Sequence, residues 1–317
     1  MAGHHPHDHG HDHHAHDAAA ALKGAGPAFG FGIALNLAYV AAEVAAGLAT
    51  GSVALLADAG HNLSDVLGLG LAWGAATLAA RPASPRFTFG LGRSTILAAL
   101  ANAMILLVAC GAILVEALRR LSTPADVPGD VVMLVAGIGV LINVGTALLF
   151  VRGQKTDLNQ RGAYLHMMAD AAISAAVVAA GLLILLTDWH WIDPVISLLV
   201  VALILRATWG LLKQSVAAAL DGVPPQIDPL RVRASLLALP GVAAVHDLHI
   251  WPITTNQVAM TAHVVMPGGH PGDAALGTMA RAMAHDFGIG HATFQIEDGL
   301  EACPAPCPVE AAFQEPA

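Results

Sequence analysis

The chain has 317 residues, of which 56% are hydrophobic and only 12% are charged, and its mean hydropathy is +0.64. Soluble domains carry about 25% charged residues, so this composition excludes an ordinary soluble protein and predicts a membrane protein with a smaller soluble part. The formal net charge of -9 counts 17 histidines as neutral. Because the sequence has neither a basic stripe nor a recognition motif, we expect no nucleic-acid partner.

The first 27 residues are polar and rich in histidine. Histidines and aspartates alternate irregularly between residues 4 and 17. A tract of this composition cannot build a packed core, so we expect a disordered tail. The tail either captures metal weakly or is a solvated segment that binds metal only incidentally. It lacks the basic segment and apolar core of a signal peptide.

Six apolar runs follow, each long enough to cross a membrane, since a spanning helix needs about 20 apolar residues. The runs cover approximately residues 29–49, 53–78, 94–118, 131–151, 162–186 and 192–212. Basic residues near the ends of the runs set the orientation in the bilayer. The side that holds both termini has Lys23, Arg81, Arg86, Arg93, Arg152, Lys155, Arg161 and Lys213, and the other side has only Arg119 and Arg120. We therefore expect six transmembrane helices with both termini in the cytoplasm.

Ionisable residues inside these runs are candidates for function, since a charge at the bilayer centre costs roughly 2.5–3.5 kcal/mol on insertion scales. His61 and Asp65 are four residues apart, which places them on one helix face. The same spacing recurs at His166 and Asp170 in the fifth run. One such pair could be a polar contact between helices. Two pairs offer two imidazoles and two carboxylates, a tetrahedral set for a divalent metal such as zinc.

Three further polar residues accompany these pairs. Asp58 precedes His61 by three residues, so it either lines the same cavity or makes a satisfied contact between helices. Asn36 and Glu43 are seven residues apart in the first run, and Glu43 should face other helices or water rather than lipid. A dication bound at the paired site would replace protons, and the empty site would take protons up again. The site therefore predicts exchange of metal for protons.

A soluble domain follows Pro224-Pro225. Amphipathic and alternating patterns predict a helix at 228–239, strands at 242–253 and 257–266, a helix at 273–287 and a strand at 291–297. The order α-β-β-α-β indicates a small α+β domain with its helices on one face of a sheet. We expect a disordered tail at 1–27, a transmembrane domain at 28–214, a cytoplasmic domain at 215–300 and a tail containing cysteine and proline at 301–317.

Several segments together resemble one family. Residues 52–65 (SVALLADAGHNLSD), with Glu43 ahead of them, HMMAD at 166–170 and Asp193-Pro194 at the start of the last run are similar to the cation diffusion facilitator family of the zinc-transporter type. HDLHIW at 246–251 and HATFQIE at 291–297 resemble the C-terminal domain of that family. The resemblance covers about residues 28–300.

The resemblance implies six transmembrane helices, a ferredoxin-like cytoplasmic domain, a homodimer, and efflux of zinc or similar metals in exchange for protons. It places His61, Asp65, His166 and Asp170 at the transport site. It also suggests that His246, His263 and Glu297 bind Zn²⁺ in the cytoplasmic domain. Possible additional ligands are His249, His285, His291, Cys303 and Cys307. Family members with an aspartate in place of the first histidine also move cadmium or iron.

Two departures from the family pattern concern metal sites. Some bacterial members have a metal site in the loop after the second helix, but residues 81–93 contain no His, Asp, Glu or Cys, so we expect none there. Many eukaryotic members have a long His-rich loop between the fourth and fifth helices, whereas here the histidine tract is at the N-terminus.

Two other classes of protein compete with a transporter. An intramembrane metalloenzyme would need an open metal position and a base, which these pairs do not supply. A membrane-bound sensor or storage protein would leave the intramembrane ligands unexplained. We therefore expect a secondary active exporter of divalent metals such as zinc, cadmium, cobalt or nickel, and not an enzyme.

Overall fold

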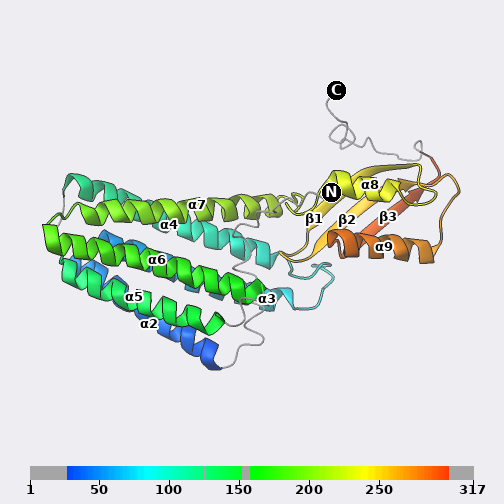
Figure 1. The fold of residues 1–317 in the computed structure, drawn as a ribbon. Helices are drawn as coiled ribbons and strands as arrows, with labels where there is room; N and C mark the ends of the chain where they lie inside the picture. Colours follow the sequence, from blue (N-terminus) through cyan, green and yellow to red (C-terminus); the bar gives the residue numbers. More distant parts are fainter. Residues whose placement is uncertain (1–26, 124–125, 152–157, 300–317) are drawn as a thin grey trace, which may run out of the picture. The chain divides into compact units, whose positions relative to one another are not determined.

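The computed structural model describes residues 27–123, 126–151 and 158–299 (Figure 1). The predictions for the histidine tract, for Cys303 and Cys307, and for the tail at 301–317 lie outside these residues. The chain forms two compact units. Among the described residues, the helical unit contains 27–77 and those between 98 and 213, and the sheet unit contains 78–97 and 214–299.

The helical unit is built from long helices that run alongside one another (Figure 1). They are α2 (Pro27–Thr50), α3 (Val53–Ala79), α4 (Ser94–Ser122), α5 (Gly129–Phe150), α6 (Leu158–Thr187) and α7 (Ile192–Ala219). Within the described residues, four of them, α4 to α7, are long and apolar enough to cross a membrane. Each helix coincides with one predicted apolar run.

Three helices extend beyond the apolar runs that predicted them. α6 begins at Leu158 rather than near 162, while α4 and α7 continue to Ser122 and Ala219 rather than ending near 118 and 212. Hydropathy marks the part of a helix suited to lipid, but helical hydrogen bonding continues through polar residues of good helix propensity, such as arginine and lysine.

The interior of the helical unit contains many small and polar residues beside its apolar clusters, and many of its large apolar residues are exposed. Ala54 and Ala136 are fully buried, whereas Leu141 and Leu186 are largely exposed. This distribution suits a bundle surrounded by lipid, where close approach of helices depends on small residues. At one such approach, a Cβ added to Gly181 of α6 would lie 2.7 Å from the Met133 nitrogen of α5.

Asp193 at the start of α7 caps the first turn of α3. Its carboxylate accepts hydrogen bonds from the Ser52 hydroxyl (2.5 Å) and from the backbone N–H groups of Val53 (2.8 Å) and Ala54 (3.4 Å). The first N–H groups of a helix have no partner within the helix, and the positive end of the helix dipole favours an anion there. This contact fixes the start of the helix that carries His61 and Asp65.

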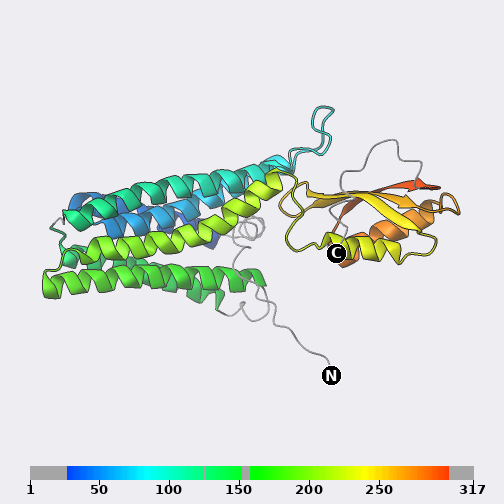
Figure 2. The ribbon, with the colours of Figure 1, turned by 90° about the horizontal axis from the view of Figure 1, so that it is seen from above.

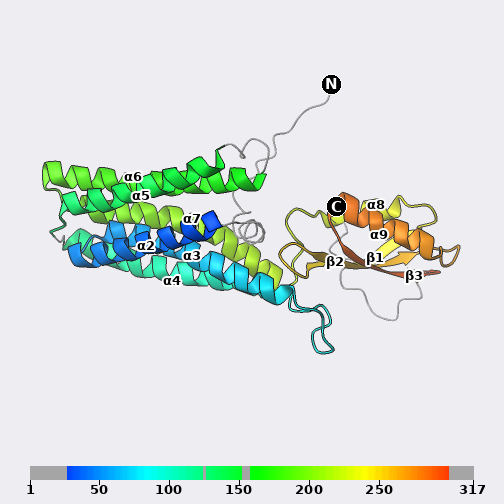
Figure 3. The same ribbon diagram turned by 90° about the horizontal axis from the view of Figure 1, so that it is seen from below.

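The sheet unit has the predicted order α-β-β-α-β. It consists of α8 (Pro229–Leu237), β1 (Ala244–Pro252), β2 (Val258–Val265), α9 (Asp273–Phe287) and β3 (His291–Glu297). β2 pairs antiparallel with β1 and parallel with β3. The parallel pair requires a crossover, which α9 provides. Both helices lie on one face of the sheet (Figure 2, Figure 3), where Leu236, Met260 and Met283 form part of the core.

Candidate metal centres

The first candidate centre lies between α3 and α6 in the helical unit. His61 Nε2 lies 3.0 Å from Asp170 Oδ1 and 3.8 Å from Asp65 Oδ2. One ligand atom from each residue lies within 4.8 Å of the others. A tetrahedral zinc ion with bonds of about 2.0 Å has ligand atoms about 3.3 Å apart, so the observed separations fit such an ion.

His166 is the fourth residue predicted for this centre. It belongs to α6, four residues before Asp170, so the backbone of α6 places both residues on one face. The side chain of His166 lies outside the described part of the structure, and its role as a ligand stays a prediction.

A network of buried polar side chains adjoins the centre. Tyr39 donates a hydrogen bond to Glu43 Oε1 (2.8 Å), and Asn62 donates one to Glu43 Oε2 (3.3 Å). Ser174 of α6 donates to Asp58 Oδ2 (2.8 Å). This hydrogen bond is a contact between α3 and α6, and the lining of the metal cavity by Asp58 stays a prediction. Glu43 and Asp58 are both fully buried, as expected for carboxyl groups that avoid lipid.

Among the described residues, no hydrogen bond links the side-chain oxygen of Asn36 to this network. Within the described residues, Asn36 Oδ1 is buried and has no hydrogen-bond partner. Asn36 and Glu43 both belong to α2, and a role for Asn36 at the metal centre stays a prediction.

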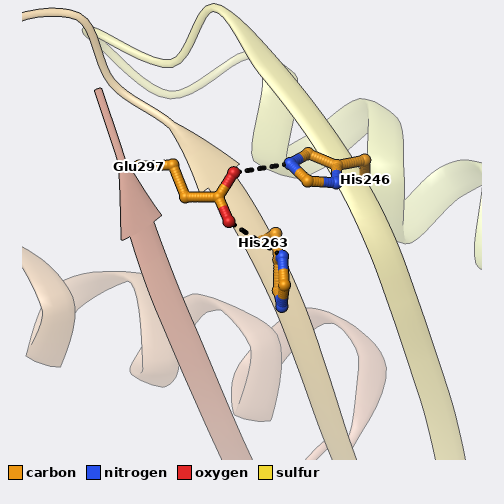
Figure 4. Close-up of side chains that lie close together, drawn as sticks. All are labelled: His246, His263 and Glu297. Carbon is orange, nitrogen blue, oxygen red and sulfur yellow. Dashed lines mark hydrogen bonds and ion pairs between the residues drawn. The ribbon is translucent and has the colours of Figure 1, made fainter. Parts of the chain in front are cut away.

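The second candidate centre lies on the sheet (Figure 4). Glu297 Oε2 lies 2.8 Å from His246 Nε2, and Glu297 Oε1 lies 3.0 Å from His263 Nδ1. The strand register explains this geometry, because His246 is the cross-strand partner of His263 and Glu297 pairs with Val265, two residues further along β2. Two imidazoles and a carboxylate with atoms within 4.8 Å of one another provide three of the four ligands that zinc prefers.

The environment of Glu297 keeps its carboxyl group ionised. Burial acts to raise the pKa of Glu297, but hydrogen bonds from Gln295 (2.8 Å) and His246, together with the charges of His246 and His263, outweigh it and lower the pKa below its ordinary value. A carboxyl group must be deprotonated to bind a metal ion. Near neutral pH, Glu297 is therefore in the ionised form that can bind one.

Asp247 extends the second centre and was not expected from the sequence. Asp247 Oδ1 lies 3.1 Å from His249 Nε2, and Asp247 Oδ2 lies 3.4 Å from His263 Nε2. Strict alternation along a strand would place His246 and Asp247 on opposite faces. The register shift between His246 and His249, with a positive φ of 49° at Asp247, permits both to approach His263.

Three other histidines of the sheet unit were predicted as additional ligands, and none of them is in this group. His249 is exposed and reaches it only through Asp247. His285, on α9, is exposed and lies 2.7 Å from Asp286. His291, at the start of β3, packs edge-on against Phe89 with ring centroids 5.6 Å apart. Within the described residues, His246, His263 and Glu297 form one group of candidate ligands, and the roles of His249, His285 and His291 as ligands stay predictions.

Groups of histidine and carboxylate side chains that could hold a metal ion, one between apolar helices and one on a sheet, define a class: an integral membrane protein that handles metal cations. Residues 31–218 match the family model of the cation efflux transmembrane domain, and residues 224–299 match that of the cation efflux protein cytoplasmic domain. The chain belongs to the cation diffusion facilitator family, whose members are cation efflux transporters and not enzymes.

Curated relatives match along most of the chain. The cation efflux system protein CzcD of Alcaligenes sp. (strain CT14) is 38% identical over 266 residues, which are 84% of this chain and 84% of the relative. The zinc transporter ZitB of Escherichia coli K12 is 38% identical over 271 residues, 85% and 86% of the two chains. The cadmium, cobalt and zinc/H(+)-K(+) antiporter of Bacillus subtilis is 35% identical over 264 residues, 82% and 85% of the two chains.

Proposed function

We propose that this protein is a secondary active transporter that exports divalent metal cations, zinc first among them, from the cytoplasm in exchange for protons. The observation that carries the proposal is the convergence of His61, Asp65 and Asp170 between two helices. Relatives named as zinc transporters and as a cadmium, cobalt and zinc antiporter support this range of cargo. A nitrogen and oxygen ligand set also suits zinc, cobalt, cadmium and nickel.

The chemistry of the ligands couples the cation to protons. A dication binds the neutral imidazole of His61 and the ionised carboxylates of Asp65 and Asp170, so it displaces any proton that they hold. When the helices rearrange and open the site to the other side of the membrane, protons take the place of the released cation. His166 completes the tetrahedral set in this proposal.

The proposed architecture assigns all six long helices, α2 to α7, to the membrane, as a transmembrane domain of residues 28–214. The excess of basic residues at one end of the helices supports cytoplasmic termini. In a bacterium the host membrane would be the cytoplasmic membrane. The match of residues 224–299 to the family's cytoplasmic domain, together with the α-β-β-α-β order, supports a ferredoxin-like domain at 215–300 that forms a homodimer.

The sheet unit holds a second zinc ion in this proposal. His246, His263 and Glu297 supply two imidazoles and a carboxylate at distances that fit one ion. Because these ligands lie on strands rather than on the long helices, an ion bound there is resident metal rather than cargo.

Transport is tested with purified protein in proteoliposomes that report zinc with one dye and pH with another. Zinc uptake with opposite proton movement, abolished by Asp170→Ala, would support transport through this centre. Asp130→Ala, which removes an exposed carboxylate of the same unit, is the matched control and should transport normally. Zinc flux that survives Asp170→Ala would place the pathway elsewhere. Zinc binding without any flux would favour the sensor or storage protein.

A further inference from the structure

We propose that Glu43 and Asp58 form a proton-binding site distinct from the metal ligands, and that this site releases its proton when a cation binds beside it. The inference rests on the metal/proton exchange proposed above. It adds that at least one of the exchanged protons is carried by carboxyl groups that never bind the metal.

Glu43 and Asp58 lie in a wholly buried environment without a fixed positive charge. Both side chains are 0% exposed. The titratable groups that act on them are Tyr39 from α2, His61 from α3 and Asp170 from α6, and α5 contributes only the Val135 carbonyl oxygen, which accepts from Tyr39 at 3.4 Å. Among these described groups there is no lysine or arginine. Two ionised carboxylates side by side in such a place would be strongly unfavourable.

The hydrogen bonds of the pair leave a place for one proton. Three of its four carboxyl oxygens accept from Tyr39, Asn62 and Ser174, whereas Asp58 Oδ1 is buried and has no donor within the described residues. Glu43 and Asp58 are also close enough to hydrogen-bond one another. Ionised carboxylates only accept hydrogen bonds, so a bond between the two requires a proton on one of them.

The pair is joined to both helices that carry the metal ligands. Asp58 precedes His61 by three residues, and Asn62, which donates to Glu43, directly follows His61. Ser174, which donates to Asp58, lies one turn beyond Asp170. A dication at His61 and Asp170 therefore places two positive charges about one helical turn, roughly 5.4 Å, from the pair.

That proximity couples the two binding events. The positive charge of the cation disfavours a proton on the pair, and a proton on the pair disfavours the cation by the same free energy, since coupling between two sites is reciprocal. The cation and this proton therefore compete without sharing a ligand atom, which allows exchange even when His61 itself is neutral.

The experiment uses the full chain in proteoliposomes and measures protons moved per zinc ion. Glu43→Gln and Asp58→Asn preserve side-chain size but cannot exchange a proton. Each should lower the ratio by about one proton per zinc and flatten the pH dependence of zinc flux, while flux down a zinc gradient persists. Ser197→Ala, a buried polar control on α7 that donates to a backbone carbonyl, should keep the unaltered ratio. A ratio unchanged in both carboxyl variants, or lowered equally in the control, would overturn the assignment.

A second measurement, made on the unaltered protein, tests the assignment even if the variants fail to fold. Infrared difference spectra, recorded on adding zinc, should show loss of absorption from a protonated carboxylic acid, and the loss should be smaller in whichever of the two variants folds. No such loss in the unaltered protein would overturn the assignment. If the unaltered protein transports zinc without any proton movement, the exchange itself fails, and the assignment fails with it.

Discussion

Asp193 and Ser52 form a hydrogen bond of 2.5 Å although 141 residues separate them. The same carboxylate accepts from the first N–H groups of α3, so one side chain of α7 both caps a helix and joins two helices. The sequence marked Asp193-Pro194 only as part of a family resemblance. The structure supplies a physical reason for the aspartate.

Asp193→Asn should therefore destabilise the helical unit. The amide keeps one acceptor oxygen but loses the charge, and the substitution should cost about 1.5–3 kcal/mol, the range for hydrogen bonds to charged groups. The measurement is the thermal unfolding midpoint in detergent. Asp130→Asn, at an exposed position near the start of α5, is the control, and an equal shift in both variants would contradict the capping role.

His61→Asp should change the selectivity of transport. The substitution replaces the nitrogen ligand with an oxygen ligand and adds a negative charge, which reduces the preference for zinc over larger or harder cations. We expect a rise in cadmium flux relative to zinc flux in proteoliposomes. An unchanged ratio of the two fluxes would show that His61 does not contribute to selectivity.

Glu297→Gln should remove one tightly bound zinc per chain while leaving the transport centre occupied. The amide cannot supply the anionic ligand that joins His246 and His263 in Figure 4. Metal content after dialysis, with affinity measured by competition against a chelating dye, gives the result. His285→Ala, which removes an exposed histidine of α9 that is not in this group of ligands, should bind zinc as the unaltered protein does.

Asp247→Asn should weaken zinc binding at the sheet centre, but by less than the removal of a ligand such as Glu297 does. Asp247 lies beside Nε2 of His263, whereas Glu297 lies beside Nδ1 of the same ring. The loss of a residue that orients a histidine ligand typically lowers metal affinity 10–100-fold. The dye competition used for Glu297→Gln measures this change. An affinity equal to that of the unaltered protein would show that Asp247 does not orient His263.

The stability of the metal-free sheet unit should fall in acid. The pKa of Glu297 is lower in the folded protein than its ordinary value of 4.5, so the unfolded chain binds more protons between the two values, and the stabilisation is lost as pH falls through that window. Denaturant unfolding with a chelator present, between about pH 3 and pH 6, measures this effect. Glu297→Gln should show a shallower dependence on pH.

The sequence predicted the helices and strands well because each of them has a hydrophobic pattern within its own residues. Apolar length located the six long helices, and strand alternation placed β1, β2 and β3 within about two residues of their ends. The pairing of His61 with Asp65 followed from helical spacing, and their approach to Asp170 was expected from the repeated motif.

The contacts that the sequence did not reveal depend on packing between distant segments. Nothing local distinguishes Ser174 as the donor to Asp58, because the two residues lie on different helices and are 116 residues apart in the sequence. Asp247 was missed because strict alternation assigns it to the wrong face, and the bulge that corrects its position is a property of the β1–β2 ladder.

The close approach of α5 and α6 at Gly181 links two of the six long helices, and the cap from Asp193 links two others, α7 and α3. His61 and Asp65 belong to one pair, and Asp170 belongs to the other. A cation bound by all three is therefore a cross-link over the seam between the pairs. In the proposed transport cycle, a bound cation would add a removable link to the permanent contacts across that seam, such as the hydrogen bond from Ser174 of α6 to Asp58 of α3.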